Sequence, residues 1–424
     1  MPGFITAHAT HPDAHMALAL AAAQVDAQRA ARQPPFAATL GLLYLTDTLA
    51  AQADTLLTAL QQRWPGVHWV GNVGVGVLAS GVEYLDEPAL VLMLCDLPAA
   101  SFQVFSGRQP LPVDAPGNTV HSALVHADPA TPDLDELITE LAGRTHSGYL
   151  FGGLTGSRGR HLHIADGVFE GGLSGVGFAA DATLGRRLVS RVTQGCQPLG
   201  PARRVTGTER NLVLTLDGQP ALPLLLAELG VGLQQPQAAM AALRGALVGL
   251  TDSGDTVLAR GGQFGADTRV RHLVGIDPAR GGVAIADVAE VGQQLTFCRR
   301  DVAAARRDLV RICTEIREEL EADLPVPALP GLLPGLLPGR HAGAAPGQPE
   351  QATPPRIAGA IYVSCAGRGG PHFGGPSAEA LILQRALGDV PLVGFFAGGE
   401  IARHHLYGYT GVLTVFSAAA PADQ

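Results

Sequence analysis

The chain has 424 residues, which is too long for one typical hydrophobic core and indicates two or more domains. All 29 basic residues are arginines, so chemistry that needs a lysine amine is excluded, including P-loop nucleotide binding and pyridoxal-phosphate Schiff bases. The net charge of −9 gives no electrostatic basis for binding nucleic acid or an anionic membrane. No apolar run approaches the roughly 20 residues that cross a bilayer, and no signal-peptide pattern opens the chain, so we expect a cytoplasmic protein.

Apolar periodicity predicts the same order of elements three times along the chain. That order is a buried strand, a helix, a strand ending in glycines, and a closing strand. The first copy follows a helix at 12–33 and comprises strand 39–46, helix 54–63, strand 67–71 and strand 89–96. The second comprises strand 119–127, helix 134–144, strand 148–159 and strand 171–180. The third comprises strand 357–367, helix 377–389, strand 391–401 and strand 411–418. The uneven spacing of the copies favours duplication over a solenoid.

The segment between the second and third copies has a different pattern. It predicts strand 210–218, helices 220–230 and 237–248, and a meander of strands 272–277, 282–288 and 293–299. A helix at 301–322 follows, with Asp301 as its N-cap. Strands outnumber helices, and many connections are tight. The predicted fold class is therefore α+β, with mixed, largely antiparallel sheets, outer helices and repeated strand-helix-strand-strand units.

Residues 325–355 form a low-complexity segment rich in proline and glycine. Such a composition rarely packs into a core, so we interpret it as a loop inserted between helix 301–322 and the next strand. The alternative is a docking segment for a partner, which would make the protein an interaction scaffold or adaptor.

Several motifs with known chemistry are incomplete in this sequence. Residues 74–79 match the glycine pattern of a dinucleotide-binding loop, but a strand follows instead of the required helix. Seven of the 14 histidines cluster in three groups without accompanying carboxylates or cysteines, so surface histidines are favoured over a metal site. These groups are His8, His11 and His15; His161 and His163; and His404 and His405. We predict no cofactor, no metal and no catalytic residue.

The five cysteines are widely spaced and contain no C-x-x-C motif, so most are expected to be buried thiols. Cys365 differs, because it ends a strand close to Arg368, where a depressed thiol pKa would permit nucleophilic attack. With His372 or His404 as its partner, Cys365 defines an alternative function, that of a Cys-dependent hydrolase or transferase.

The segment 394–405 combines two glycines with a carboxylate that follows a buried strand. Glu400 cannot easily remain buried without a partner, and Arg368 is the candidate. An arginine and a glutamate facing each other beside Gly398 and Gly399 would suit a zwitterion such as an amino acid. The alternative is a structural ion pair that holds two loops together.

These residues resemble the FIST family (F-box and intracellular signal transduction proteins). In the FIST C domain a Cys and an Arg-Gly pair follow a strand, and a helix and a G-F-x-x-x-G-E-I motif come next. The match is carried by Cys365, Arg368, Gly369, Gly394, Phe395, Gly399, Glu400 and Ile401. Residues 192–222 resemble the start of the same domain. Residues 11–180 resemble the FIST N domain, with Gly71, Gly76 and Gly152-Gly153 at its glycine-rich junctions.

The resemblance implies a FIST N-like domain at 1–183 and a FIST C-like domain at 184–424. It further implies a sensor or signal-transduction module that binds small ligands, such as amino acids, and acts on a separate signalling protein. The candidate ligand-binding residues are Cys365, Arg368, Gly369, Gly398, Gly399 and Glu400. Secondary candidates are Gly71, Asn72, Gly152, Gly153 and Thr155. Asn72 and Val73 depart from the small polar residues usual after the first junction glycine.

Overall fold

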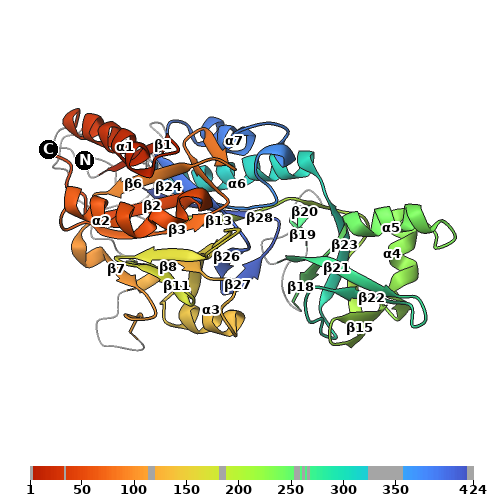
Figure 1. Cartoon of the computed structure of the whole chain (residues 1–424). Coiled ribbons are helices and arrows are strands. Elements are labelled where there is room, and N and C mark those ends of the chain that lie inside the picture. The colour runs from red at the N-terminus through yellow and green to blue at the C-terminus, as the bar shows by residue number, and fades with distance from the viewer. Residues whose placement is uncertain are drawn as a thin grey trace, which may run out of the picture.

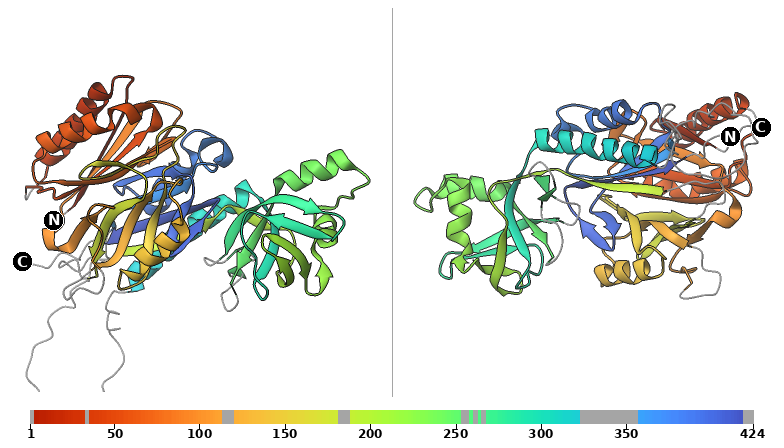
Figure 2. Two further views of the ribbon diagram at one scale, coloured as in Figure 1. Left: turned by 60° about the horizontal axis from the view of Figure 1, so that its bottom comes forward. Right: turned by 180° about the vertical axis from the view of Figure 1, so that it is seen from behind.

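The computed structural model describes residues 3–32, 35–112, 120–180, 188–252, 258–259, 263–264, 268–322 and 357–417. These residues form two parts (Figure 1). The larger part, which we call the body, contains three six-stranded sheets and most of the helices. The smaller part is a β-barrel between residues 196 and 300, which stands to one side of the body (Figure 2).

The strands follow the same order in all three sheets of the body. An additional strand lies at one edge, and next to it come the closing strand, the first strand and the second strand of one copy. A hairpin lies at the other edge. Sheet one is β1 (Phe4–Thr10), β6 (Ala89–Cys95), β2 (Leu40–Thr46), β3 (His68–Gly74), β10 (Leu162–Ala165) and β11 (Val168–Glu170). Sheet two is β7 (Phe102–Phe105), β12 (Leu173–Ala179), β8 (Val120–Ala127), β9 (Tyr149–Leu154), β26 (Glu400–Arg403) and β27 (His405–Tyr407). Sheet three is β13 (Leu188–Gln194), β28 (Thr410–Ser417), β24 (Ile357–Cys365), β25 (Leu392–Ala397), β4 (Gly76–Ala79) and β5 (Val82–Leu85).

Each copy contributes its hairpin to the sheet of another copy. The first copy's β4–β5 hairpin pairs with β25 of sheet three. The second copy's β10–β11 hairpin pairs with β3 of sheet one. The third copy's β26–β27 hairpin pairs with β9 of sheet two. The exchange is cyclic, so each of the three sheets is completed only when another copy has folded onto it.

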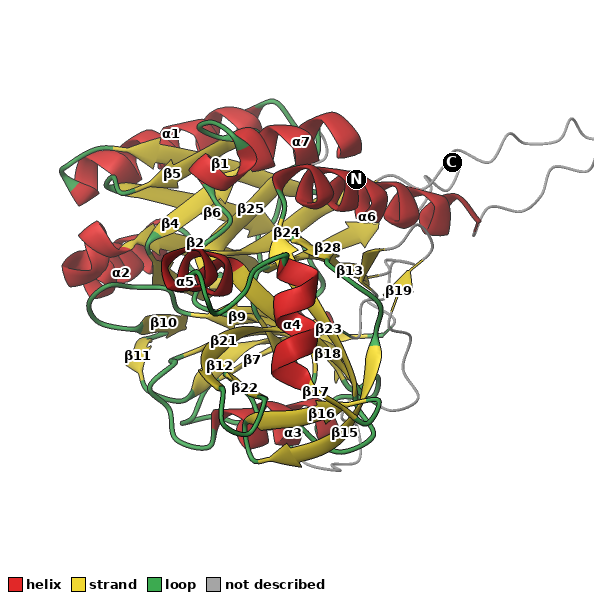
Figure 3. Cartoon of the chain, turned by 90° about the vertical axis from the view of Figure 1, so that its right-hand side faces the viewer, coloured by secondary structure: helices red, strands yellow, loops and turns green. Residues whose placement is uncertain are grey.

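The helices lie outside the sheets, and the inner faces of all three sheets share one hydrophobic core. In each copy a helix joins two parallel strands; these helices are α2 (Ala53–Arg63), α3 (Leu134–Gly143) and α7 (Ala378–Leu387). Two longer helices, α1 (Ala14–Ala30) and α6 (Val302–Ala322), pack over sheets one and three. Figure 3 shows α1, α7 and α6 along one side of the body. Short 3-10 helices occur at Asp47–Gln52, Ala99–Ser101 and Gly370–Phe373.

The barrel closes because β23 (Gln294–Arg300) pairs with both β15 (Arg203–Glu209) and β18 (Ala246–Thr251). The other barrel strands are β16 (Leu212–Leu216), β22 (Gly282–Ile285) and β21 (Arg269–Asp277), with β14 (Cys196–Pro198) and β17 (Gln219–Pro220) at its edges. A separate pair is formed by β19 (Leu258–Ala259) and β20 (Gln263–Phe264), and the barrel segment carries α4 (Ala221–Leu229) and α5 (Pro236–Gly245). The chain enters the barrel after β13 and leaves it into α6. The Asp301 amide donates to the Gly195 carbonyl at 3.1 Å, which ties these two connections together.

The α+β fold class and the three repeated units are confirmed. The meander prediction is wrong for its third strand, because β22 pairs with β16 and β21 whereas β23 pairs with β14, β15 and β18. The helix predicted at 237–248 ends at Gly245, because Ala246 begins a buried strand. The 325–355 segment and the predicted domain boundary at 183 lie outside the described residues. Among the described helices, none combines the length and apolar character needed to cross a membrane.

Candidate functional site

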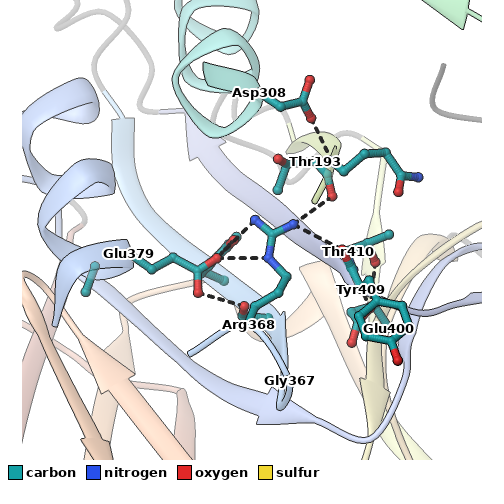
Figure 4. A network of polar contacts seen from close by, with 12 residues as sticks. Thr193, Asp308, Gly367, Arg368, Glu379, Glu400, Tyr409 and Thr410 are labelled. Carbon is teal, nitrogen blue, oxygen red and sulfur yellow. Dashed lines mark hydrogen bonds and ion pairs between the residues drawn. The ribbon is translucent and has the colours of Figure 1, made fainter. Parts of the chain in front are cut away.

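Arg368 lies at the centre of a buried polar network where the barrel joins the body (Figure 4). Its side chain is 0% exposed, and its Nε and Nη2 atoms each lie 3.2 Å from Oε1 of Glu379. Its Nη1 donates to the carbonyl oxygens of Thr193, at 3.4 Å, and Tyr409, at 3.2 Å. The guanidinium also lies over the Phe373 ring. The ion-pair partner of Arg368 is therefore Glu379 and not, as predicted, Glu400.

Glu379, which the sequence analysis did not select, is the ion-pair partner of Arg368. It lies on α7 and is 0% exposed. Besides the arginine, the Tyr362 hydroxyl donates to Oε1 at 2.6 Å and the Ser364 hydroxyl donates to Oε2 at 2.9 Å. Both charges are thus paired and hydrogen-bonded, as buried charges must be. This geometry corresponds to a structural ion pair, and it leaves Arg368 without access to a ligand.

The same network fixes the two chain connections that lead to the barrel. A Cβ on Gly195 would lie 3.3 Å from Nη1 of Arg368 and 3.0 Å from the Tyr409 carbonyl oxygen. Next to Gly195, the backbone N–H of Gln194 donates to the buried Asp308 carboxylate of α6 at 2.7 Å. The Gln194 side chain in turn donates to a carbonyl of the barrel segment, that of Thr268. Arg368 therefore anchors the junction between the barrel and the body.

Glu400 occupies a separate buried position on β26 and is 0% exposed. Its Oε2 accepts hydrogen bonds from the Thr410 amide at 3.0 Å and the Thr410 hydroxyl at 2.6 Å. Burial raises the pKa of Glu400 to about 7, although hydrogen bonds from Thr410, the charge of Arg368 and the Cys365 thiol each lower it. The carboxyl group is therefore close to half ionised at neutral pH.

Because the pKa of Glu400 is raised in the folded state, we predict that the free energy of unfolding depends on pH. The Glu400 carboxyl has an ordinary pKa of 4.5 and a folded-state pKa of about 7, so the folded state binds the proton more tightly. The contribution of the protonated Glu400 carboxyl to the free energy of unfolding is therefore fully present below pH 4.5, and it is lost as the pH rises through 7. Relative to Glu400→Gln, the wild-type free energy of unfolding should fall by about 3 kcal/mol between these limits. Urea unfolding of both proteins at pH 4.5 and 8 measures this difference, and parallel pH profiles would contradict it.

Cys365 is the only partly exposed thiol among the five cysteines, all of which are free. Burial and then the charge of Glu400 raise the pKa of the Cys365 thiol to about 12, although the Gly367 and Tyr409 amides favour the thiolate. The expectation of a depressed pKa is therefore wrong, because the thiol is largely buried and, in addition, has the Glu400 carboxyl group as a neighbour. In the described part of the chain, neither His372 nor His404 forms a hydrogen bond with Cys365. The arrangement does not support a nucleophilic cysteine.

A small cradle surrounds Gly367, at the surface beside Cys365. A Cβ placed on Gly367 would lie 3.8 Å from Nη2 of Arg300, Sγ of Cys365 and Cε1 of Tyr409. Arg300 comes from the barrel; it lies over the Tyr409 ring and donates to the Gly367 carbonyl. Within the described ranges, no carboxylate forms an ion pair with Arg300. We call Arg300, Cys365, Gly367 and Tyr409 the Gly367 cradle.

The pairing of β9 with β26 brings two of the three glycine-rich junctions together. Glu400 lies directly opposite Gly153 in this pairing. The Gly398 amide donates to the Leu154 carbonyl at 3.1 Å. The candidate residues that meet here are Gly152, Gly153, Thr155, Gly398, Gly399 and Glu400. Strand exchange between copies thus brings together residues separated by more than two hundred positions.

The remaining candidates lie elsewhere. Gly369 packs against the Phe396 ring. Gly71 and Asn72 are on β3 of sheet one, where Asn72 is buried and neither of its amide atoms has a hydrogen-bond partner. The expectation that His163 is a surface residue is wrong, because it is 1% exposed and bonds the Ser174 hydroxyl. The described residues contain no group of three or more metal ligands.

Comparison with known proteins gives matches along most of the chain. A model of the FIST N domain matches residues 39–219, and a model of the FIST C domain matches residues 221–403. The chain belongs to the FIST family. An uncharacterized protein of Mycobacterium tuberculosis is 32% identical over 96% of this chain and 97% of its own length. One from Mycobacterium bovis is 33% identical over the same shares.

FIST domains are generally associated with signal transduction and ligand sensing. The two family models meet between β17 and α4, inside the barrel segment. The FIST C match ends at residue 403 inside the third copy, and it includes β26, which pairs with β9 in sheet two of the FIST N region. The FIST N and FIST C parts of this protein are consequently joined by continuous strand pairing as well as by the chain itself.

Proposed function

We propose that this FIST protein is a cytoplasmic sensor of a small carboxylate-bearing metabolite, such as an amino acid, and that it signals to a separate protein. The proposal includes no enzymatic activity. The family association with ligand sensing supports it, and the Gly367 cradle is the observation that carries it. In the cradle, the partly exposed candidate residue Cys365 of the body lies beside Arg300, a cation of the barrel.

The chemistry of the cradle favours a carboxylate. Arg300 can form a bidentate pair with a carboxylate, which is stronger and more directional than its present hydrogen bond to the Gly367 carbonyl. The Tyr409 ring and the Cys365 side chain supply an apolar wall beside this cation. Since Gly367 has no side chain, a methyl-sized group fits at 3.8 Å from all three neighbours.

The position of the cradle suggests how binding could be transmitted. Arg300 is the last residue of β23 in the barrel, whereas Cys365 and Tyr409 belong to the body. A ligand that draws Arg300 away from the Gly367 carbonyl changes a contact between the two parts. A ligand shifts only those states that it binds with different affinity, so this contact is the place where bound and free states would differ. In this proposal Arg368 and Glu400 position the residues of the Gly367 cradle but do not contact the ligand.

Filling the cradle should abolish binding while preserving the fold. Gly367 is exposed and has no positive φ, so Gly367→Val should fold normally. The probe is a panel of the twenty amino acids and their oxo- and dicarboxylic acid relatives, tested by thermal shift and calorimetry. We expect a saturable rise in Tm for the wild type with one class, and at least a tenfold loss of affinity in Gly367→Val.

The matched control is Gly245→Val, at a helix end where a Cβ would meet nothing within 4 Å. It should bind like the wild type. Unchanged affinity in Gly367→Val would contradict the cradle as the site. The absence of any saturable shift in the folded wild type would contradict the carboxylate class.

A further inference from the structure

Side chains of α1 cover the free edge of strand β1. β1 is the outermost strand of sheet one, so one row of its backbone N–H and C=O groups has no neighbouring strand to bond. Figure 1 shows α1 beside this strand. Three α1 side chains, spaced four residues apart, bond the row instead; they are Gln24, Gln28 and Arg32.

These hydrogen bonds follow β1 in order along the strand. The Gln24 side chain donates to the His8 carbonyl at 2.8 Å and accepts from the His8 amide at 3.2 Å. The Gln28 side chain donates to the Thr6 carbonyl at 2.7 Å. Gln24 therefore uses both ends of its side-chain amide, as a residue of a neighbouring strand uses both of its backbone groups.

Arg32 extends the row to the start of the strand, where its Nη2 donates to the Phe4 carbonyl at 2.7 Å. The fit has a geometric reason. Four residues of a helix advance about 6.0 Å and two residues of a strand about 6.8 Å, so helical positions four apart meet every second strand residue. The carbonyls of every second residue face the same edge of the strand. The three α1 side chains thus take the place of a neighbouring strand.

β1 has none of the other features that protect a sheet edge. Edge strands are normally kept from pairing with other chains by shortness, charged residues, proline or a bulge. Four other edge strands of the body sheets, β5, β7, β11 and β27, have only three or four residues. β13 has seven residues but carries Arg191. β1 also has seven residues, contains no proline, arginine or carboxylate, and pairs with β6 without a bulge.

The strand that fits an uncovered β1 edge is β1 of a second copy. Two copies running antiparallel about a two-fold axis at Ala7 would place Thr6 of one opposite His8 of the other. Both residues turn their backbone groups outward, so each such pair can exchange two hydrogen bonds. We propose that the three α1 side chains keep β1 from pairing with the β1 strand of a second copy, and that this edge becomes a dimer interface when they are removed.

The test replaces the three side chains in the full chain, as Gln24→Ala/Gln28→Ala/Arg32→Ala. Alanine has the highest helix propensity, so α1 should stay folded, which circular dichroism checks. Sedimentation equilibrium should give self-association with a dissociation constant at least about tenfold below that of the wild type. Hydrogen exchange locates the contact, because the amides of residues 4–10 should exchange more slowly as the concentration of the variant rises. Gln28→Ala alone should produce a smaller change of the same kind.

A fourth substitution and a matched control decide whether β1 is the contact. Because the Thr6 carbonyl faces outward, its N–H does too, and Thr6→Pro removes that donor at an edge position where proline is tolerated. Added to the triple variant, Thr6→Pro should restore the wild-type dissociation constant.

The control, Arg29→Ala/Gln52→Ala/Gln62→Ala, removes the same residue types and the same charge from positions that do not bond β1, and it should behave like the wild type. Any of three results would overturn the proposal: a triple variant that associates no more than the wild type, association that survives Thr6→Pro, or equal association of the control.

Discussion

Replacing Arg368 with methionine should lower the free energy of unfolding by about 3 to 5 kcal/mol, because it leaves the Glu379 carboxylate buried without its counter-charge. Both side chains are 0% exposed, so water cannot compensate for the lost partner. The variant also loses the two hydrogen bonds from Arg368 to the carbonyls of Thr193 and Tyr409. A decrease in Tm of roughly 10 °C is the corresponding result in a thermal melt.

A double-mutant cycle separates the ion pair from general loss of packing. Glu379→Gln keeps an acceptor for the Tyr362 hydroxyl and removes the charge, so Arg368→Met/Glu379→Gln should recover part of the loss. The matched control is the Arg160–Glu170 pair, whose side chains are 62% and 49% exposed. Arg160→Met should cost less than about 1 kcal/mol. Strictly additive effects at Arg368 and Glu379 would show that the two charges are not coupled.

The sequence identified Arg368 but not its partner, and the reason is local. An acidic residue in the first turn of a helix is ordinarily explained by the helix dipole, and Glu379 occupies that position in α7. Nothing in the pattern shows that this turn faces inward, toward the Tyr362 and Ser364 hydroxyls. Glu400 was the more conspicuous carboxylate because it follows a buried strand, yet its Oε2 bonds Thr410 and not Arg368.

The repeated units were predictable because each contains long apolar strands and a periodic helix. The exchange of hairpins was not, since the exchanged strands are only three or four residues long and lie among glycines. Their pairings also join distant parts of the chain, as in the register of Ala79 with Val393. The apolar periodicity within a short stretch of sequence carries no information about pairing between strands that are far apart in the chain. The Gly367 cradle is hidden for the same reason, because Arg300 reaches it from another part of the fold.

Three glycines at equivalent positions in the three copies are expected to tolerate no side chain. Gly71, Gly152 and Gly394 lie in the second strand of their copy, each opposite a residue of the first strand. A Cβ at these positions would lie 1.7, 1.9 and 1.7 Å from the carbonyl oxygen of that residue. In an ordinary strand the Cβ points out of the sheet. Here it would point at the neighbouring backbone, which cannot move without breaking the parallel pairing.

Gly394→Ala and Gly71→Ala should therefore destabilise the protein by more than about 4 kcal/mol, an effect that few single substitutions reach. The measurement is the yield of soluble protein together with urea unfolding of any that folds. The controls are Gly143→Ala and Gly245→Ala, at helix ends where a Cβ meets nothing within 4 Å; these should be neutral or slightly stabilising. A fully stable Gly394→Ala protein would mean that the strands can separate there. In that case the close pairing of β24 with β25 would not determine the orientation of the junction that carries Glu400.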